Sequence, residues 1–297
     1  MSSLLLSTET TFVSPPPAEL GHQAMQALLA EVNLPGKPGL VGPDGTRSHA
    51  DMDVELMRLS ARTLEPTFTK LAEAGNSLEV GQELRDVVGE IGREGEEAML
   101  TATGGVNTHR GAIWNLGLMV IATAGLGQQQ PRERPCANLI TRHAGRLASI
   151  PDSFTDHRPR PGATARKRFR VGGAVSEAAA GFPHVLAALR GMSSTEGYTD
   201  LPPTNTQKLR GLLTSMSSLD DTCVLHRGGQ EGLEFVQSGA LALLAVSTSE
   251  PATWATALKN FDHQLAERDL SAGGSADLLA CALFLTSILG AEHADNQ

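Results

Sequence analysis

Several scarcities narrow the classes to which this protein can belong. Aromatic residues make up 4% of the 297 residues, and the hydrophobic share of 40% comes mainly from Leu, Ala, Met and Val. Strands favour aromatic and β-branched residues, so this composition favours packed helices over sheets. The three cysteines have no paired spacing, which argues against a zinc knuckle or a disulfide framework. No stretch reaches the roughly 18 uncharged apolar residues of a membrane span.

Basic charge is also scarce. The chain has 24 Lys and Arg against 33 Asp and Glu, a formal net charge of -9 and a pI near 5.5. A general nucleic-acid binder carries a basic surface, so broad binding to a phosphate backbone is disfavoured, although a local pocket with a metal ion can still bind a nucleotide. The chain start lacks a basic segment followed by a long apolar run, so we expect no signal peptide and a reducing, cytoplasmic environment.

Apolar residues recur with helical spacing along most of the chain. We predict an all-α protein: a flexible tail over residues 1–17, which end in three prolines, and a single domain over 18–292 that resembles a helical bundle, with glycine-rich joints forming the active site. Residues 151–170 are predicted to form a long basic loop. Helices are expected over 18–33, from Ser48 onward, and over 79–102, 109–125, 174–191, 204–219, 230–247, 252–269 and 275–289.

The first polar joint contains Lys37 within a glycine-rich stretch and then His49, Asp51 and Asp53. Glycines let the backbone approach a ligand, and Lys37 can hold a phosphate. His49 and Asp53 are spaced i, i+4, on one face of a helix. Asp51 and Asp53 are close enough in the chain to share a magnesium ion through oxygen ligands. The alternative is that Asp51 only completes a capping box with Ser48.

The second joint is a polar, glycine-rich turn before the helix predicted over 109–125. A helix start offers unpaired N–H groups and a positive dipole, which suit phosphate. Cations are disfavoured there, so the presence of His109 and Arg110 favours a functional role over a plain cap. An acidic stretch precedes the turn, and most of it is expected to be a solvated face. The candidates from this joint are Glu96, Thr103, Gly104, Gly105, Asn107, Thr108, His109 and Arg110.

Two further joints have similar chemistry. Asp221 is the second of two adjacent aspartates predicted to end an apolar helix, where the dipole opposes negative charge and a metal ion or an arginine would compensate. The alternative is an exposed, frayed helix end. His226 and Arg227 stand beside two glycines and are candidates for a phosphate contact. Gly273 and Ser275 precede an apolar helix, which is typical of an anion site but also of a plain N-cap. No Walker loop, Rossmann fingerprint, zinc signature or nucleophile elbow is present.

Taken in order, these joints resemble the triphosphoribosyl-dephospho-CoA synthase family, which makes the prosthetic-group precursor of malonate decarboxylase and citrate lyase. The resemblance covers about residues 20–290, and its most specific part is the turn over 103–109. Arg110, Cys223 and Val175 depart from the family pattern, where lysine, asparagine and arginine are common. Arg110 keeps the charge. The other matching segments are 37–41, 49–53, Asp221 with Thr222, 226–229, 273–277, and Glu177 with 181–183.

The resemblance implies that the 5-triphosphoribosyl group of ATP is transferred to the 2′-hydroxyl of 3′-dephospho-CoA, with release of adenine. The product would pass to a phosphoribosyl-dephospho-CoA transferase that acts on an acyl carrier protein. Of the two pathways, we favour that of malonate decarboxylase. We expect no nucleic-acid or membrane partner, and a homodimer is a further expectation.

The same resemblance suggests roles for the residues. A triphosphate concentrates negative charge, so Mg²⁺ and cationic side chains are needed. Cleavage of the ribose–adenine bond builds oxocarbenium character, which a carboxylate stabilises, and a base must take the hydroxyl proton. The predicted metal ligands are Asp51, Asp53 and Asp221. The predicted catalytic residues are His109, Glu96 and Asp53, with the base left open between His109 and Glu96. The predicted substrate and phosphate contacts are Lys37, His49, Thr103, Gly104, Gly105, Asn107, Thr108, Arg110, His226, Arg227, Gly273 and Ser275.

Two other functions fit these residues. A magnesium-dependent helical enzyme such as an ADP-ribosyl hydrolase would use water as the acceptor and release adenine without dephospho-CoA. A non-catalytic helical protein would bind a nucleotide or a carrier protein without releasing adenine. The clustering of Lys, His, Asp and Arg in glycine-rich joints argues against the second, because a scaffold does not need them.

Overall fold

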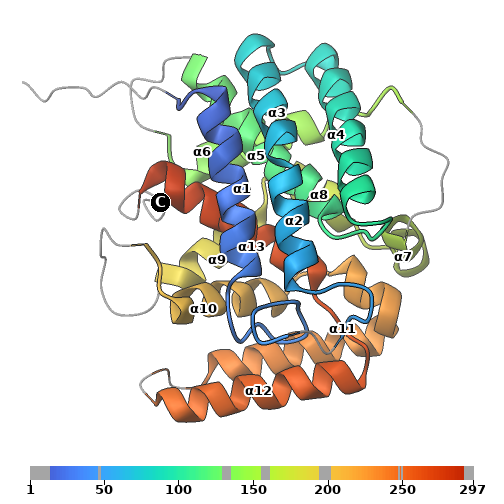
Figure 1. Ribbon diagram of the computed structural model, residues 1–297, viewed down its shortest axis with the longest axis vertical. Coiled ribbons are helices and arrows are strands. Elements are labelled where there is room, and N and C mark those ends of the chain that lie inside the picture. Colours follow the sequence, from blue (N-terminus) through green and yellow to red (C-terminus); the bar gives the residue numbers. More distant parts are fainter. Residues whose placement is uncertain are drawn as a thin grey trace, which may run out of the picture.

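The computed structural model describes residues 14–45, 48–128, 135–154, 161–193, 202–246, 248 and 250–290. Within these residues the chain is built from α-helices, and the single β-type contact is an isolated bridge between Gly42 and Gly45. The all-α prediction is therefore confirmed (Figure 1). No helix in the described part is long and apolar enough to cross a membrane.

The predicted tail falls mostly on residues 1–13, outside the described residues, and Pro17 already belongs to the first helix. The helices are α1 (Pro17–Val32), α2 (Val54–Thr63), α3 (Glu65–Ser77), α4 (Gln82–Ala102), α5 (Arg110–Gln128), α6 (Ala137–Ala148), α7 (Pro161–Phe169), α8 (Gly173–Ala179), α9 (Pro183–Ser193), α10 (Asn205–Met216), α11 (Thr222–Leu244), α12 (Pro251–Glu267) and α13 (Gly273–Leu289).

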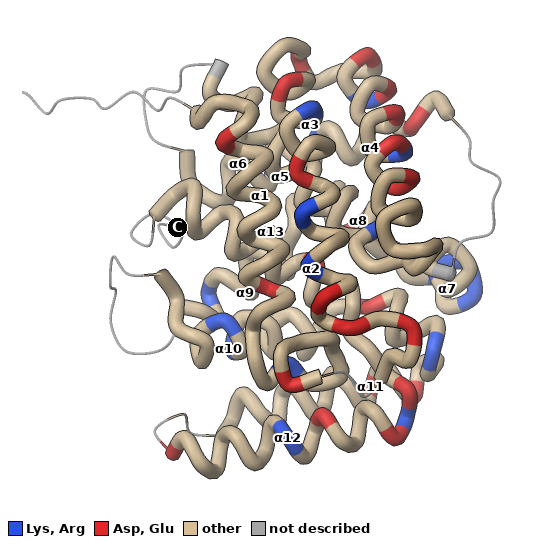
Figure 2. Tube along the Cα trace, in the orientation of Figure 1, with Lys and Arg blue, Asp and Glu red and all other residues tan. Residues whose placement is uncertain are grey.

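Two helices, α5 and α13, form the centre of the fold. Each is apolar almost all round its axis, and such a helix must be covered on every side. They pack against each other and against α1, α3, α6, α9 and α10, while α12 lies across the lower end in Figure 1. Figure 2 shows both central helices almost free of charged residues. Each carries a single charged side chain, Arg110 on α5 and Asp277 on α13, and both lie in the first two turns.

Several helix predictions need correction. Ser48 does not open a helix, because α2 begins after Asp53. The predicted basic loop over 151–170 contains the helix α7, whose basic residues are coloured blue in Figure 2, while residues 155–160 lie outside the described residues. The single helix predicted over 174–191 is divided into α8 and α9, because Gly181 (φ 81°) and Phe182 (φ 57°) both adopt left-handed backbone between them.

Other helices begin earlier than predicted or were not anticipated. α11 starts at Thr222 instead of residue 230 and contains a kink at Gly229, where φ is 61° and ψ is -157°. α3 and α6 were not predicted. α3 has Pro66 in its first turn, which a helix start tolerates because that N–H would be unpaired anyway. Thr204 and Gln207 form a capping box at the start of α10.

Candidate active site

A cavity of about 770 Å³ lies where the polar joints meet. The first residues of three helices, α5, α11 and α13, line it, so the positive ends of three helix dipoles face one space. Such an arrangement favours an anionic ligand. The predicted site residues that line the cavity are His49, Asp51, Glu96, Asn107, Thr108, His109, Arg110, Asp221, His226, Arg227 and Gly273. Those outside its lining are Lys37, Asp53, Thr103, Gly104, Gly105 and Ser275.

Asp221 joins two of these helix starts. Its Oδ1 accepts a hydrogen bond from the backbone N–H of Cys223 (2.9 Å), and its Oδ2 accepts from the backbone N–H (2.9 Å) and hydroxyl (3.2 Å) of Ser275. Asp221 therefore caps α11 and ties it to α13, so the dipoles favour its charge rather than oppose it. Its burial nevertheless raises the pKa of this carboxyl. Both carboxylate oxygens of Asp221 accept hydrogen bonds at helix starts. Asp221 therefore acts as a cap in this structure, whereas the sequence analysis predicted a metal ligand.

Asp277 is a cavity carboxylate that the sequence analysis noticed only as part of a motif. Its Oδ2 would lie 1.9 Å from a Cβ at Gly111, so the carboxylate fits against the first turn of α5 only because that position is glycine. No described residue donates a hydrogen bond to it. Burial, together with the nearby charges of Glu31 and Asp221, raises its pKa well above the usual value. A lone carboxylate of this kind suits proton transfer.

His109 is buried at the start of α5 and faces the same cavity. Its Nδ1 lies 2.8 Å from Ser60 Oγ, and the Thr108 hydroxyl donates to that Oγ at 2.6 Å. The Ser60 hydroxyl then has Nδ1 as its acceptor, so we assign the ring proton to Nε2, which has no hydrogen-bond partner in the described structure. Burial, and then the charge of Lys37, lowers the pKa of His109 to about 3. The ring is therefore neutral near pH 7, and its Nε2–H is a donor to the cavity.

Glu96 and Arg110 form an ion pair across the cavity wall. The Nε and Nη2 atoms of Arg110 lie 2.8 and 2.7 Å from Glu96 Oε1. This carboxylate compensates for a cation at the start of α5, which the dipole would otherwise disfavour. Glu96 is therefore held by a cation, whereas a general base needs a free lone pair directed at the substrate.

Arg227 is held at the opposite joint. Its Nη1 donates to the carbonyl of Ser48 (2.9 Å) and to Asp269 Oδ1 (2.7 Å), and its Nη2 lies 3.1 Å from His49 Nδ1. Burial, and then the charge of Arg227, lowers the pKa of His49. The neutral His49 accepts from Arg227 at Nδ1 and donates from Nε2 to the hydroxyl of Ser271 at 3.0 Å. This network fixes a cation at the cavity wall.

Lys37 is buried beneath the site instead of lining it. Its Nζ lies 2.5 Å from Glu31 Oε1, and the two side chains are 2% and 5% exposed. Burial lowers the pKa of Lys37, and the Glu31 carboxylate opposes that shift. A fully buried ammonium paired to a carboxylate is a structural element of the joint, so the predicted phosphate contact at Lys37 is not supported by its position.

The glycine-rich turn shapes the chain between α4 and α5. Gly104 (φ 65°) and Gly105 (φ 91°) adopt left-handed backbone, and the Gly105 N–H donates to the carbonyl of Leu100 at 2.7 Å, as at many helix ends. The Thr103 hydroxyl donates to the carbonyl of Val106 at 2.6 Å. Thr103, Gly104 and Gly105, which were predicted as substrate contacts, therefore position the segment Asn107–Arg110. This following segment lines the cavity.

Asp53 is the N-cap of α2, and its exposed carboxylate accepts a hydrogen bond from the Leu56 N–H at 2.8 Å. His49 precedes the helix, so the predicted shared helix face does not exist. We expect Asp53→Asn to keep full activity and stability because asparagine caps equally well, whereas Asp53→Ala should lower the free energy of unfolding by about 1 kcal/mol. Thermal melts and turnover rates of both variants check this. An inactive but stable Asp53→Asn would restore Asp53 as a catalytic or metal-binding residue.

The predicted metal ligands Asp51, Asp53 and Asp221 do not converge. Nowhere in the described part of the chain do three or more His, Cys, Asp or Glu side chains gather closely enough to hold a metal ion by themselves. Asp51 and Asp220 do line the cavity, and both are exposed. Magnesium in nucleotide sites is commonly held by one or two carboxylates, water and the phosphates, so the residues present fit an ion that arrives with a triphosphate.

Sequence reasoning missed several residues of this site: Ser60, Arg85, Arg93, Trp114 and Asp277. Ser60 is an isolated hydroxyl on an amphipathic helix and gives no signal until it meets His109. Arg85 and Arg93 are separated by two helical turns with Gly89 between them, and that four-residue spacing is a signal that could have been read.

The chain is 42% identical over 272 residues to the 2-(5''-triphosphoribosyl)-3'-dephosphocoenzyme-A synthase of Klebsiella pneumoniae, covering 91% of this chain and 95% of that protein. It is 44% identical over 268 residues to a probable synthase of the same name from Azotobacter vinelandii, covering 88% of each chain. No solved structure matches it. The family model described as ATP:dephospho-CoA triphosphoribosyl transferase matches residues 17–296. The chain therefore belongs to the ATP:dephospho-CoA triphosphoribosyl transferase family.

Proposed function

We propose that this transferase joins C1′ of the ATP ribose to the 2′-hydroxyl of 3′-dephospho-CoA and releases adenine, in a single cavity that receives both nucleotides. The observation that carries the proposal is the convergence of three helix N-termini with Arg110 and Arg227 on one cavity. Its volume of about 770 Å³ lies in the upper part of the range of ligand pockets.

The triphosphate of ATP is assigned to the starts of α11 and α13. The Thr222 and Gly273 positions supply the N-terminal turns, and His226 and Arg227 line the same wall. Mg²⁺ would neutralise part of the triphosphate charge when bound, with Asp51 and Asp220 as the carboxylates placed to contribute. These residues keep the phosphates in position while the far end of the ribose reacts.

The chemical step breaks the bond between C1′ and the adenine nitrogen, which departs with the electron pair and takes up a proton from water. The 2′-oxygen of dephospho-CoA forms the new bond to C1′ and loses its proton. We assign that proton to Asp277, because it is the cavity carboxylate that accepts no hydrogen bond and whose pKa is raised by burial. Its charge also stabilises an oxocarbenium-like transition state. His109 donates an Nε2 hydrogen bond to a substrate atom, and Arg110 keeps Glu96 out of the proton transfer.

The product is a triphosphoribosyl nucleotide that a phosphoribosyl-dephospho-CoA transferase attaches to an acyl carrier protein, and we favour the malonate decarboxylase pathway. All three cysteines are free thiols, which suits a reducing cytoplasm. The expected homodimer is tested by the molar mass in solution.

The test is to incubate the pure protein with ATP, Mg²⁺ and dephospho-CoA and to follow adenine and the coupled product by chromatography and mass spectrometry. We expect both products together, and neither when dephospho-CoA or Mg²⁺ is left out. Adenine without the acceptor would instead identify a hydrolase. No adenine from a folded sample would identify a binding protein and would overturn the proposal.

A further inference from the structure

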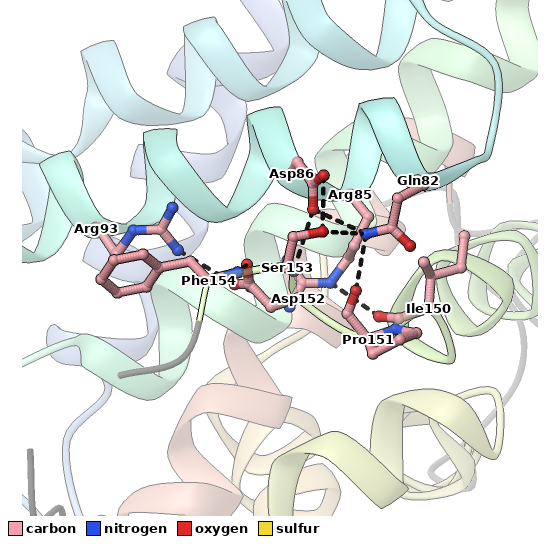
Figure 3. Close-up of polar contacts among 9 residues, drawn as sticks. All are labelled: Gln82, Arg85, Asp86, Arg93, Ile150, Pro151, Asp152, Ser153 and Phe154. Atoms are coloured by element: carbon pink, nitrogen blue, oxygen red, sulfur yellow. Dashed lines mark hydrogen bonds and ion pairs between the residues drawn. The ribbon is translucent and has the colours of Figure 1, made fainter. Parts of the chain in front are cut away.

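A second cationic cluster lies on a different wall of the cavity, between α4 and the segment that follows α6 (Figure 3). Arg85 and Arg93 both reach toward Asp152, with Nη2 and Nη1 at 3.3 and 3.2 Å from its Oδ2. Arg85 Nε also donates to the carbonyl of Ile150 at 3.1 Å. Two guanidinium groups therefore share the Asp152 carboxylate, while Asp86, whose charge also acts on Arg85, lies outside the cavity lining.

The hydrogen bonds of this cluster are incomplete. Arg85 is 6% exposed, yet its Nη1 has no hydrogen-bond partner in the described structure. A buried charged donor without an acceptor is costly, and native proteins usually satisfy it with a ligand, an ion or water. Because Arg85 and Arg93 line the cavity, the missing acceptor can arrive from that space.

The absence of a side chain at Gly89 lets this cluster lie close against the backbone of α4. A Cβ at this position would lie 2.7 Å from Asp152 Oδ2, 3.1 Å from Arg93 Nη1 and 3.2 Å from Arg85 Nη1. The two guanidinium groups and the carboxylate thus meet over a helix position without a side chain. Gly89 itself lines the cavity.

Each guanidinium group is also held flat by an aromatic ring. Arg85 lies over Trp114 at 5.1 Å from the ring centre, and Arg93 lies over Phe154 at 4.2 Å. Stacking fixes the orientation of the planar fork, which is the geometry used for two-point binding of phosphates. In a chain with 4% aromatic residues, two rings placed under two cavity arginines indicate a binding site and not only a surface ion pair.

We infer that Arg85 and Arg93 bind the 5′-diphosphate of the acceptor, dephospho-CoA, at this wall of the cavity. This inference rests on the proposed function, because a cavity that joins two nucleotides needs two separate anion subsites. The starts of α11 and α13, with Arg227, serve the triphosphate, so the α4 wall is left for the second nucleotide. The two ribose groups then meet between the walls, beside Asp277.

The first test measures binding rather than turnover. Calorimetric titration with dephospho-CoA alone, and with ATP and Mg²⁺ alone, is done on the wild type and on Arg93→Gln. We expect the Kd of dephospho-CoA to rise on the order of 10- to 100-fold in the variant, since a charged hydrogen-bonding partner is lost, while the Kd of ATP stays unchanged. Arg62→Gln, an exposed arginine of α2 outside the cavity lining, is the matched control.

Two further variants separate a subsite from a structural clamp. Asp152→Asn removes the competing carboxylate, so dephospho-CoA binding should be retained or tightened. Gly89→Ala favours the helix but pushes a methyl group between the guanidinium groups, so dephospho-CoA binding should weaken without a lower melting temperature. If the cluster only holds α4 against the segment after α6, Arg93→Gln and Asp152→Asn should both lower the melting temperature and leave both Kd values unchanged.

The outcomes are distinct. Loss of ATP binding in Arg93→Gln, with dephospho-CoA binding intact, would overturn the inference and assign this wall to the triphosphate. Unchanged Kd values for both nucleotides would overturn it as well. Selective loss of dephospho-CoA binding would support it even if the wild type released no adenine, in which case only the proposed transfer reaction would fail.

Discussion

Asp277→Asn is expected to lower kcat by about 10²- to 10⁴-fold, the usual contribution of a general base. The carboxylate is the proposed proton acceptor, and asparagine has nearly the same shape but cannot take a proton. The same substitution should make the folded protein more stable at neutral pH. Burial, Glu31 and Asp221 all disfavour the ionised form of Asp277 in the folded state, and asparagine removes that unfavourable charge.

The pH dependence of stability and that of activity have different signs for Asp277. The folded protein holds the Asp277 proton to a higher pH than the unfolded chain does, so the fold loses stability as the pH rises from the pKa of the unfolded chain up to the raised pKa, and loses no more above it. Catalysis requires the ionised form of Asp277, because a general base must be able to accept a proton. We therefore expect wild-type kcat to fall as the pH is lowered through that pKa, and the stability gain of Asp277→Asn to shrink below it and to disappear below the pKa of the unfolded chain.

These expectations are checked with turnover rates and thermal melts over a pH series. Glu234→Gln, an exposed carboxylate of α11 outside the cavity lining, is the control for loss of one charge. An unchanged kcat in Asp277→Asn would remove Asp277 from the mechanism and return the base to His109 or Glu96. A lower melting temperature would show that the carboxylate stabilises the joint and that its loss of activity comes from misfolding.

Lys37→Met should lower the free energy of unfolding by about 3–5 kcal/mol, which is the cost of leaving one partner of a buried ion pair alone. Its partner Glu31 is 5% exposed and also lines the cavity, so the unpaired carboxylate would remain buried beside Asp277. Activity should fall together with stability. Chemical denaturation measured by circular dichroism reports the loss.

The double variant Glu31→Leu with Lys37→Met distinguishes a structural role of Lys37 from a role in ligand binding. Replacing a buried ion pair by apolar side chains of similar size is often neutral or stabilising, so we expect the double variant to regain stability. If Lys37 is structural, activity returns with it. A stable double variant with a greatly raised KM for ATP would show that Lys37 contacts the phosphates after all, as the sequence analysis predicted.

The sequence by itself determined the helical class, the family and part of the cavity lining. Low aromatic content and helical spacing of apolar residues are local properties, and they predicted packed helices. The polar joints could be identified for a similar reason: unusual residues such as His109 and Arg110 at a helix start need an explanation that a plain cap does not give. Helix boundaries near Pro66 and Phe182 were harder to place. At both positions the backbone departs from a continuous helix, although the apolar residues keep their helical spacing.

Only the tertiary structure decided what each polar residue does. Lys37, Asp53 and Asp221 carry the right chemistry for phosphate or magnesium, yet one is paired under the cavity and two cap helices. Asp277 and the arginine pair on α4 gave a weak signal, because their partners come from distant parts of the chain. Hydrogen-bond partners, burial and shared charge depend on which segments meet in space, and local spacing in the chain does not fix them.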